Sequence, residues 1–301
     1  MKTTSREIIA RKLRTLWRKS LLTLRGRVRH HDRFGLSYWL WTDTRAMGRQ
    51  KLEPGTDDTG VLEQLKRIYQ LIGQPDRDLI SVDVGAYIGV ISLAMSHFGP
   101  SKHTIHSFEA DSLNFSRLRQ NVTLIPNTSI TTHNKAVADF EGESTFTRYK
   151  DPGNNHLGTR QNHKINVDSL HQVQVTTLDT FVRETGIDII DVLKIDVEGF
   201  DLSVLRGAKR ILDQERINTI IIETPTNKSQ RKEVNDFLNS HGFVTAYIVR
   251  NSKKLIETSE SVFTSHAKTP LNILAIKSKL IHTTDEDDTG NKLQNMFAVS
   301  T

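Results

Sequence analysis

The stretch from Leu79 to Gly89 limits what this chain can fold into more than any other. It is an apolar run that ends in Asp83 and passes through two glycines separated by three residues. An apolar pattern at helical spacing follows the second glycine. The stretch therefore predicts a buried parallel strand, a tight turn and a helix that begins near Ile88. The glycines, the first of which is Gly85, let the backbone turn sharply and approach a ligand, and the helix start offers free N–H groups.

A second short strand is predicted from Thr104 to Phe108, and it ends in Glu109. This acid follows Asp83 by 26 residues. That separation is close to the one that places an acid at the end of a second strand on the ribose of a nucleotide. Since cofactors bind at the first strand–helix turn of an open α/β sheet, the two segments together predict a cofactor crevice.

A third element of this kind, residues 189–199, is a predicted buried strand whose carboxyl end carries Asp196 and Glu198. With the two earlier segments, with residues 176–179 and with residues 204–208, it resembles the FkbM-type family of S-adenosylmethionine-dependent methyltransferases. The resemblance covers about residues 79–225. It implies an α/β fold of the class I methyltransferase type. In that fold a Rossmann-like sheet is mostly parallel, its last strand is antiparallel, and helices cover both faces.

The same resemblance implies S-adenosylmethionine as the cofactor. An ionised Glu109 would accept hydrogen bonds from both ribose hydroxyls, because a carboxylate is an acceptor with two oxygens. The backbone from Gly85 through Tyr87 to Gly89 would pass under the methionine part. Asp83 would meet the ammonium group of that part directly or through water.

Methyl transfer to oxygen requires the acceptor hydroxyl to lose a proton, so a base is expected near the reacting atoms. Asp196 and Glu198 stand two residues apart, and alternate side chains of a strand point to the same side. They are the predicted catalytic residues, one orienting the acceptor while the other takes a proton. Alternatively, these acids form an ion-pair network with Lys194 or bind a divalent cation, although no metal site is predicted. His156 and Glu223 are the second candidates.

The predicted reaction is O-methylation of a hydroxyl on a sugar, a glycan or another small metabolite. Two alternatives stay open: an RNA methyltransferase, and a binding protein that has lost methyl transfer. A nicotinamide-dependent dehydrogenase is disfavoured because its Gly-x-Gly-x-x-Gly turn would need glycine where Tyr87 stands. The chain also contains no Gly-x-x-x-x-Gly-Lys-Ser/Thr segment, which excludes a P-loop nucleotidase.

Basic charge is concentrated at the start of the chain. Residues 1–34 hold 11 of the 41 lysines and arginines against Glu7 and Asp32, a net charge of +9. The remainder has 30 basic and 33 acidic residues, a net charge of −3. Apolar residues from Ile9 to Leu24 fall on one side of a predicted helix, with arginine and lysine opposite. Such a helix would pack on the domain or another subunit, lie on an anionic membrane surface, or contact nucleic acid; a transit peptide has a similar composition.

The chain has no cysteine and no window of 18 uninterrupted apolar residues, and its mean hydropathy is −0.43. These features exclude disulfides and cysteine nucleophiles and predict no transmembrane helix. The expected location is the cytoplasm, with attachment to a membrane through the basic helix left open.

Four regions are predicted: a basic amphipathic helix (1–33), a cap or linker with a helix (34–78), the methyltransferase domain (79–281) and a disordered tail (282–301). Within the third, residues 141–176 predict a β insertion over the active site, with a turn-rich loop at 150–156 as a lid. Just before it, a strand at 129–133 leads to Ala136, which the resemblance places at the adenine. The last two strands are expected to form an antiparallel hairpin that ends the sheet.

Overall fold

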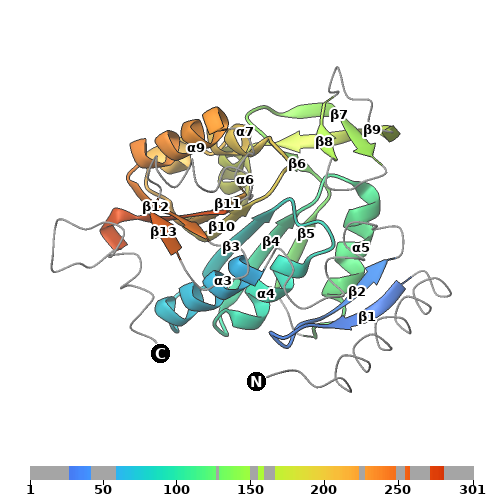
Figure 1. Ribbon diagram of the computed structural model, residues 1–301, viewed down its shortest axis with the longest axis horizontal. Coiled ribbons are helices and arrows are strands. Elements are labelled where there is room, and N and C mark those ends of the chain that lie inside the picture. The colour runs from blue at the N-terminus through green and yellow to red at the C-terminus, as the bar shows by residue number, and fades with distance from the viewer. Residues whose placement is uncertain are drawn as a thin grey trace, which may run out of the picture.

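The computed structural model describes residues 27–41, 59–126, 129–149, 155–158, 167–223, 228–248, 255–257 and 272–280. At its centre is an eight-stranded sheet (Figure 1) in the order β13-β12-β14-β11-β10-β3-β4-β5. Its strands are β3 (Leu79–Val84), β4 (His103–Phe108), β5 (Ile130–His133), β10 (Ile190–Ile195), β11 (Ile217–Glu223), β12 (Phe243–Ile248), β13 (Leu255–Glu257) and β14 (Asn272–Lys277).

The sheet is parallel through its central strands. β3 pairs in parallel with both β4 and β10, and the same direction continues to β5 and β11. All six residues of β10 are buried, as expected for a strand with both faces covered. β14 is antiparallel to β11 and to β12. The predicted fold class, a mostly parallel sheet with an antiparallel last strand, is confirmed.

The predicted antiparallel pairing of the last two strands is confirmed, because β12 and β14 are antiparallel neighbours. Only their place in the sheet differs, since β13, which was not predicted, forms the edge and β14 lies between β11 and β12. Five of the six residues of β14 are buried, including neighbours that point to opposite faces. A strand that is apolar on both faces is most stable in the interior of a covered sheet, whereas an edge strand exposes backbone polar groups.

Helices cover both faces (Figure 1), as predicted. On one face, α3 (Thr59–Ile72) and α4 (Val90–Phe98) share a core with sheet residues such as Leu79 and Ile221. On the other face the core includes α6 (Leu178–Thr185), α7 (Asp201–Arg206), α8 (Lys209–Asp213) and α9 (Lys228–Ser240). α5 (Ser112–Val122) packs beside β5. Within the part of the chain described, no helix is long and apolar enough to cross a bilayer.

The first described element is a hairpin of β1 (Arg27–His31) and β2 (Ser37–Trp41). The basic helix was predicted to extend to residue 33, but Arg27–His31 form a strand. The rest of the predicted helix, residues 1–26, lies outside the described residues. Asn121 of α5 fastens the hairpin to the body. Its Oδ1 accepts the Trp39 backbone N–H at 2.7 Å, and its Nδ2 donates to the Ile88 carbonyl at 2.8 Å. Alternate residues of β2 join the α3–α4 core. The four-region division stays a prediction.

The predicted β strands between residues 141 and 176 are present in a second, four-stranded sheet. It contains β6 (Ala136–Val137), β7 (Gly142–Tyr149), β8 (His156–Leu157) and β9 (Val167–Thr176) in the order β6-β9-β7-β8. Residues 150–154 and 159–166 lie outside the described residues, and so does the tail after residue 280. The lid and the disordered tail therefore stay predictions.

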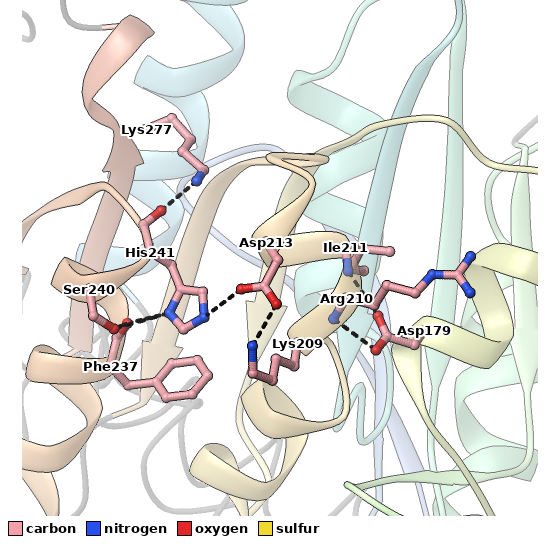
Figure 2. Close-up of polar contacts among 9 residues, drawn as sticks. All are labelled: Asp179, Lys209, Arg210, Ile211, Asp213, Phe237, Ser240, His241 and Lys277. Carbon is pink, nitrogen blue, oxygen red and sulfur yellow. Dashed lines mark hydrogen bonds and ion pairs between the residues drawn. The ribbon is translucent and has the colours of Figure 1, made fainter.

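Two of the signature segments hold the helices of the second face together. Thr177 caps the start of α6, and Asp179 accepts the backbone N–H groups of Arg210 and Ile211 at 2.9 and 3.0 Å, which caps α8 (Figure 2). A Cβ at Gly207 would overlap the Ala138 carbonyl. Asp213 at the end of α8 forms an ion pair with Lys209, and the His241 ring lies 3.4 Å from its carboxylate (Figure 2). These residues have a structural role.

Replacing Gly85 by alanine should unfold or strongly destabilise the protein. Gly85 has a φ of 76°, and a Cβ there would overlap the backbone oxygen of Asp196 on the neighbouring strand. Such backbone overlap should cost about 3 kcal/mol or more. Gly186→Ala is the control, because Gly186 has a φ of 68° and open space around its Cβ position, so it should lose only about 1–2 kcal/mol. Equal losses in urea unfolding would refute close packing at Gly85.

Candidate active site

The turn after β3 is bonded to the end of the neighbouring strand. The backbone N–H groups of Gly85 and Ala86 both donate to the Phe108 carbonyl, at 3.0 and 2.8 Å. Tyr87 has a φ of 52° and Gly89 a φ of 91°, and Gly89 is the residue from which α4 begins. The helix thus starts two residues later than predicted. Three of the five residues in this turn, Gly85, Tyr87 and Gly89, have a positive φ. Glycine adopts such a conformation without strain, which explains why two of the three are glycines.

Glu109 is placed at the turn by its own hydrogen bonds. Its Oε2 accepts the Tyr87 backbone N–H at 2.8 Å and its Oε1 accepts the Asp111 backbone N–H at 2.9 Å. The side chain is buried, and burial raises the pKa of this carboxyl to about 7. A carboxylate can accept about four hydrogen bonds, so acceptor capacity remains on both oxygens. Two neighbouring hydroxyl groups could therefore each donate a hydrogen bond to this carboxylate.

Asp83 is fully buried, one strand position before the turn. Its Oδ2 accepts the Ser92 hydroxyl at 2.6 Å, and its Oδ1 lies 3.3 Å from the ammonium of Lys194. The structure therefore gives this acid a serine of α4 and a lysine of β10 as partners. Its predicted contact with the cofactor ammonium stays a prediction.

The inserted sheet contacts the loop after β4, which carries Glu109 and Asp111. Arg148 of β7 forms a two-pronged ion pair with the carboxylate of Asp111, which is itself buried and caps α5 through the Leu113 N–H. Asn134 donates to the Glu109 carbonyl at 2.8 Å. Ala136 follows on β6 and is also buried. The loop that carries Glu109 is thus fixed from three sides.

The predicted catalytic acids lie together at the carboxyl end of β10. Asp196 is about two-fifths exposed, and Glu198 has a φ of 52°, a conformation that non-glycine residues rarely adopt. Glu223, from the end of β11, joins them, and one carboxylate oxygen from each of the three lies within 4.8 Å of the others. Three carboxylates at that spacing could hold a divalent cation.

The negative charge of this group changes its protonation. The nearby Asp196 carboxylate and burial raise the pKa of Glu223 far above its usual range, so Glu223 carries a proton at neutral pH and can donate to Asp196. Asp201 accepts the Val197 and Gly199 N–H groups, and burial raises its pKa to about 6. The site therefore combines a protonated carboxyl group, that of Glu223, with carboxylates that can accept a hydrogen bond.

Lys194 joins the two halves of the site. Its ammonium is buried and lies 3.3 Å from Asp83, 3.4 Å from Asp196 and 3.0 Å from the Gly85 carbonyl, to which it donates. The sequence analysis offered carboxylate partners for this lysine as an alternative, and the structure shows two of them. The predicted ion pair is present between Lys194 and Asp196, and the catalytic role of Asp196 and Glu198 stays a prediction.

Sequence reasoning found most of these residues and missed some. Glu223 was a second candidate, and its strand-end position was the signal for it. Arg148 and Asp111 were not singled out, because nothing in the sequence shows that two residues 37 positions apart are paired. The side chain of His156 lies outside what the structure describes.

Comparisons with known proteins agree with this arrangement. Residues 83–245, more than half of the chain, match the family model described as the methyltransferase FkbM domain. Methyltransferase 1 of Beauveria bassiana is 29% identical over 201 residues, 60% of this chain and 78% of that protein. The hexuronic acid methyltransferase AglP of Haloferax volcanii is 27% identical over 172 residues, 54% of this chain and 66% of that protein.

A solved structure from Methylobacillus flagellatus, described as methyltransferase FkbM, is 15% identical with a TM-score of 0.45, covering 88% of this chain and 60% of that one. The family match, the sheet order and the strand-end acids lead to the same conclusion: the chain belongs to the FkbM methyltransferase family, with the α/β fold of class I methyltransferases.

Proposed function

We propose that this methyltransferase uses S-adenosylmethionine to methylate a hydroxyl oxygen on a sugar, a glycan or another small metabolite. The observation that carries the proposal is the position of two sets of acids at one edge of the sheet. Glu109, with acceptor capacity left, ends β4, and Asp196 and Glu198 follow β10, with only β3 between these strands. In open α/β sheets the crevice at the carboxyl ends of the strands binds the ligand.

The residues present fit the cofactor. Glu109 is a buried carboxylate held by two backbone N–H groups, and its remaining lone pairs match two ribose hydroxyls. Ala136 is buried near the Glu109 loop, where the adenine is expected. When bound, S-adenosylmethionine supplies an electrophilic methyl group on a sulfonium sulfur. The protein's task is then to hold the acceptor in line with that group and to take its proton.

The acids after β10 are suited to that task. The acceptor hydroxyl would donate to Asp196 or Glu198, and that carboxylate would take its proton as the hydroxyl oxygen replaces the sulfur on the methyl carbon, leaving S-adenosylhomocysteine. Protonated Glu223 would hydrogen-bond to Asp196 and fix its orientation. Lys194 would limit the repulsion between Asp196 and Asp83. The relative that is named as a hexuronic acid methyltransferase supports a sugar acceptor.

Glu109→Gln should weaken binding of S-adenosylhomocysteine on the order of 10- to 100-fold, since hydrogen bonds to a charged group contribute about 1.5–3 kcal/mol each. Glutamine keeps only one acceptor oxygen for the two backbone N–H groups, so the variant should also lose some stability, and thermal melting checks that it is folded. Glu233→Gln, an exposed glutamate on α9, is the control and should bind like wild type. Titration calorimetry gives both affinities, and unchanged affinity in Glu109→Gln would remove Glu109 from the site.

The same binding should depend on pH. The pKa of Glu109 is raised to about 7 in the free protein, and hydroxyl donors favour its ionised form. Affinity for S-adenosylhomocysteine should therefore be constant well above pH 7 and fall about tenfold per pH unit below it. Glu109→Gln should remove this dependence. A profile that is equally steep in the variant would assign the titration to another group.

Asp196→Asn and Glu198→Gln should lower turnover by about 10²–10⁴-fold while binding of S-adenosylhomocysteine is kept. Glu223→Gln should stay close to wild type, because Glu223 is already protonated and glutamine can also donate. Asp188→Asn is the control, since that side chain is 92% exposed before β10. If both Asp196→Asn and Glu198→Gln bind S-adenosylhomocysteine and keep full turnover, these acids are not catalytic and their role is limited to structural ion pairs.

These assays need an acceptor, which incubation of labelled donor with glycan, metabolite, lipid and RNA pools would supply. Label in glycan or metabolite is expected, and label in RNA alone would contradict the proposed substrate class. A chelator should leave turnover unchanged. Loss of activity that Mg²⁺ restores would instead make Asp196, Glu198 and Glu223 ligands of a cation.

A further inference from the structure

The outward face of the β1–β2 hairpin is built from arginine and tryptophan. In the antiparallel register, Arg27 is opposite Trp41 and Arg29 is opposite Trp39. Directly opposite residues lie on the same face of a two-stranded sheet. The other face of β2 is buried in the core, whereas these four residues are partly exposed. Trp41 also packs against the core, and the centre of its ring lies 5.3 Å from the guanidinium of Arg117 in α5. Arg27, Arg29, Trp39 and Trp41 together form the Arg–Trp face.

The side chains of this face support one another. The guanidinium of Arg27 lies 4.6 Å from the centre of the Trp39 ring, and that of Arg29 lies 5.6 Å from it. Arg27 also donates to Gln120 of α5. Cations within about 6 Å of the centre of an indole ring are attracted to its face. These two contacts hold two cations beside an amphipathic aromatic ring.

Positive charge is concentrated around the Arg–Trp face. Residues 27–41 contain three arginines and one acid, Asp32, whose carboxylate accepts the backbone N–H groups of Phe34 and Leu36 within the turn. The neighbouring helix α5 contributes an exposed Arg119 and contains no acid. The preceding residues 1–26 have eight lysines and arginines against Glu7. The rest of the chain is slightly acidic, so the positive charge of the sequence is concentrated in its first 41 residues.

We propose that the Arg–Trp face docks the protein on a bilayer containing anionic phospholipid. Arginines near such a surface are attracted to the headgroup phosphates, and tryptophan prefers the boundary between headgroups and acyl chains. RNA would also attract the arginines. However, the sequence just before Arg27 has apolar residues at helical spacing opposite its basic ones, and that apolar side fits a bilayer surface and not a phosphate backbone. The proposal does not depend on the acceptor of the methyl group.

Sedimentation of the full chain with vesicles tests the charge requirement. The protein should bind vesicles of phosphatidylcholine with phosphatidylserine, should bind phosphatidylcholine alone much more weakly, and should be released by salt. Arg27→Gln with Arg29→Gln should lower the partition constant on the order of thirtyfold, at about 1 kcal/mol per basic residue. Arg27→Lys with Arg29→Lys keeps the charge and should retain most of the binding.

The matched control removes two positive charges elsewhere. Arg206→Gln with Lys209→Gln changes exposed residues of α7 and α8, which pack on the other side of the sheet, and should leave vesicle binding unchanged. Equal losses in this control and in the Arg27–Arg29 glutamine variant would show that only net charge matters and would overturn the Arg–Trp face as the docking surface. Thermal melting of each variant confirms that it is folded.

Tryptophan fluorescence locates the contact. The three tryptophans of the chain are Trp17, Trp39 and Trp41, so Trp17→Phe leaves only those of the hairpin. Brominated phosphatidylcholine mixed into the anionic vesicles should quench the emission of this variant and shift it to the blue. Absence of quenching in Trp17→Phe would move the contact away from the hairpin to residues 1–26. Binding of RNA that displaces the vesicles, or no vesicle binding at all, would also overturn the proposal.

Discussion

The site at the carboxyl edge of the sheet depends on the contacts that the buried ammonium group of Lys194 makes with two carboxylates and a backbone carbonyl. Burying a cation is costly unless it is paired and hydrogen-bonded. Here the buried ammonium meets Asp83 on one side, Asp196 on the other and the Gly85 carbonyl at the turn. Removing the lysine would leave Asp83 as a fully buried acid whose remaining hydrogen-bond partner among the described residues is Ser92. In addition to the backbone pairing of β3 with β10, one side chain therefore links the turn after β3 to the acids after β10.

A second chain of contacts fixes the Glu109 side of the site. Glu109 is bonded to the turn through the Tyr87 N–H, and to its own loop through the Asp111 N–H. Asp111 is bonded in turn to Arg148, which comes from the inserted sheet. An arginine–carboxylate pair with two parallel bonds fixes direction as well as distance. The insertion thereby positions the loop that carries Glu109, in addition to any role over the acceptor.

How far the sequence could predict this site follows from the range of each interaction. Apolar runs and glycines are local signals, so the strands that end in Asp83, Glu109 and Asp196 were found from them. The pairing of Arg148 with Asp111 depends on how two sheets meet, and no local pattern encodes that. Likewise the position of β14 between β11 and β12 depends on strand order, which periodicity does not report. The strand at Arg27–His31 was read as helix because the helical pattern before it was extended too far.

The charges at the sheet edge also bear on the acceptor. Asp196, Glu198 and Asp201 lie close together, and protonation of Glu223 and the charge of Lys194 reduce the total without cancelling it. A phosphate about 6 Å from one such carboxylate would be repelled by about 3 kcal/mol at an effective dielectric constant near 20. A neutral hydroxyl incurs no such cost and donates to the same oxygens. A sugar acceptor that carries its own carboxylate would therefore have to present its hydroxyl to the β10 acids and its negative charge away from them, whereas an RNA backbone would bring a phosphate on each side of the reacting ribose.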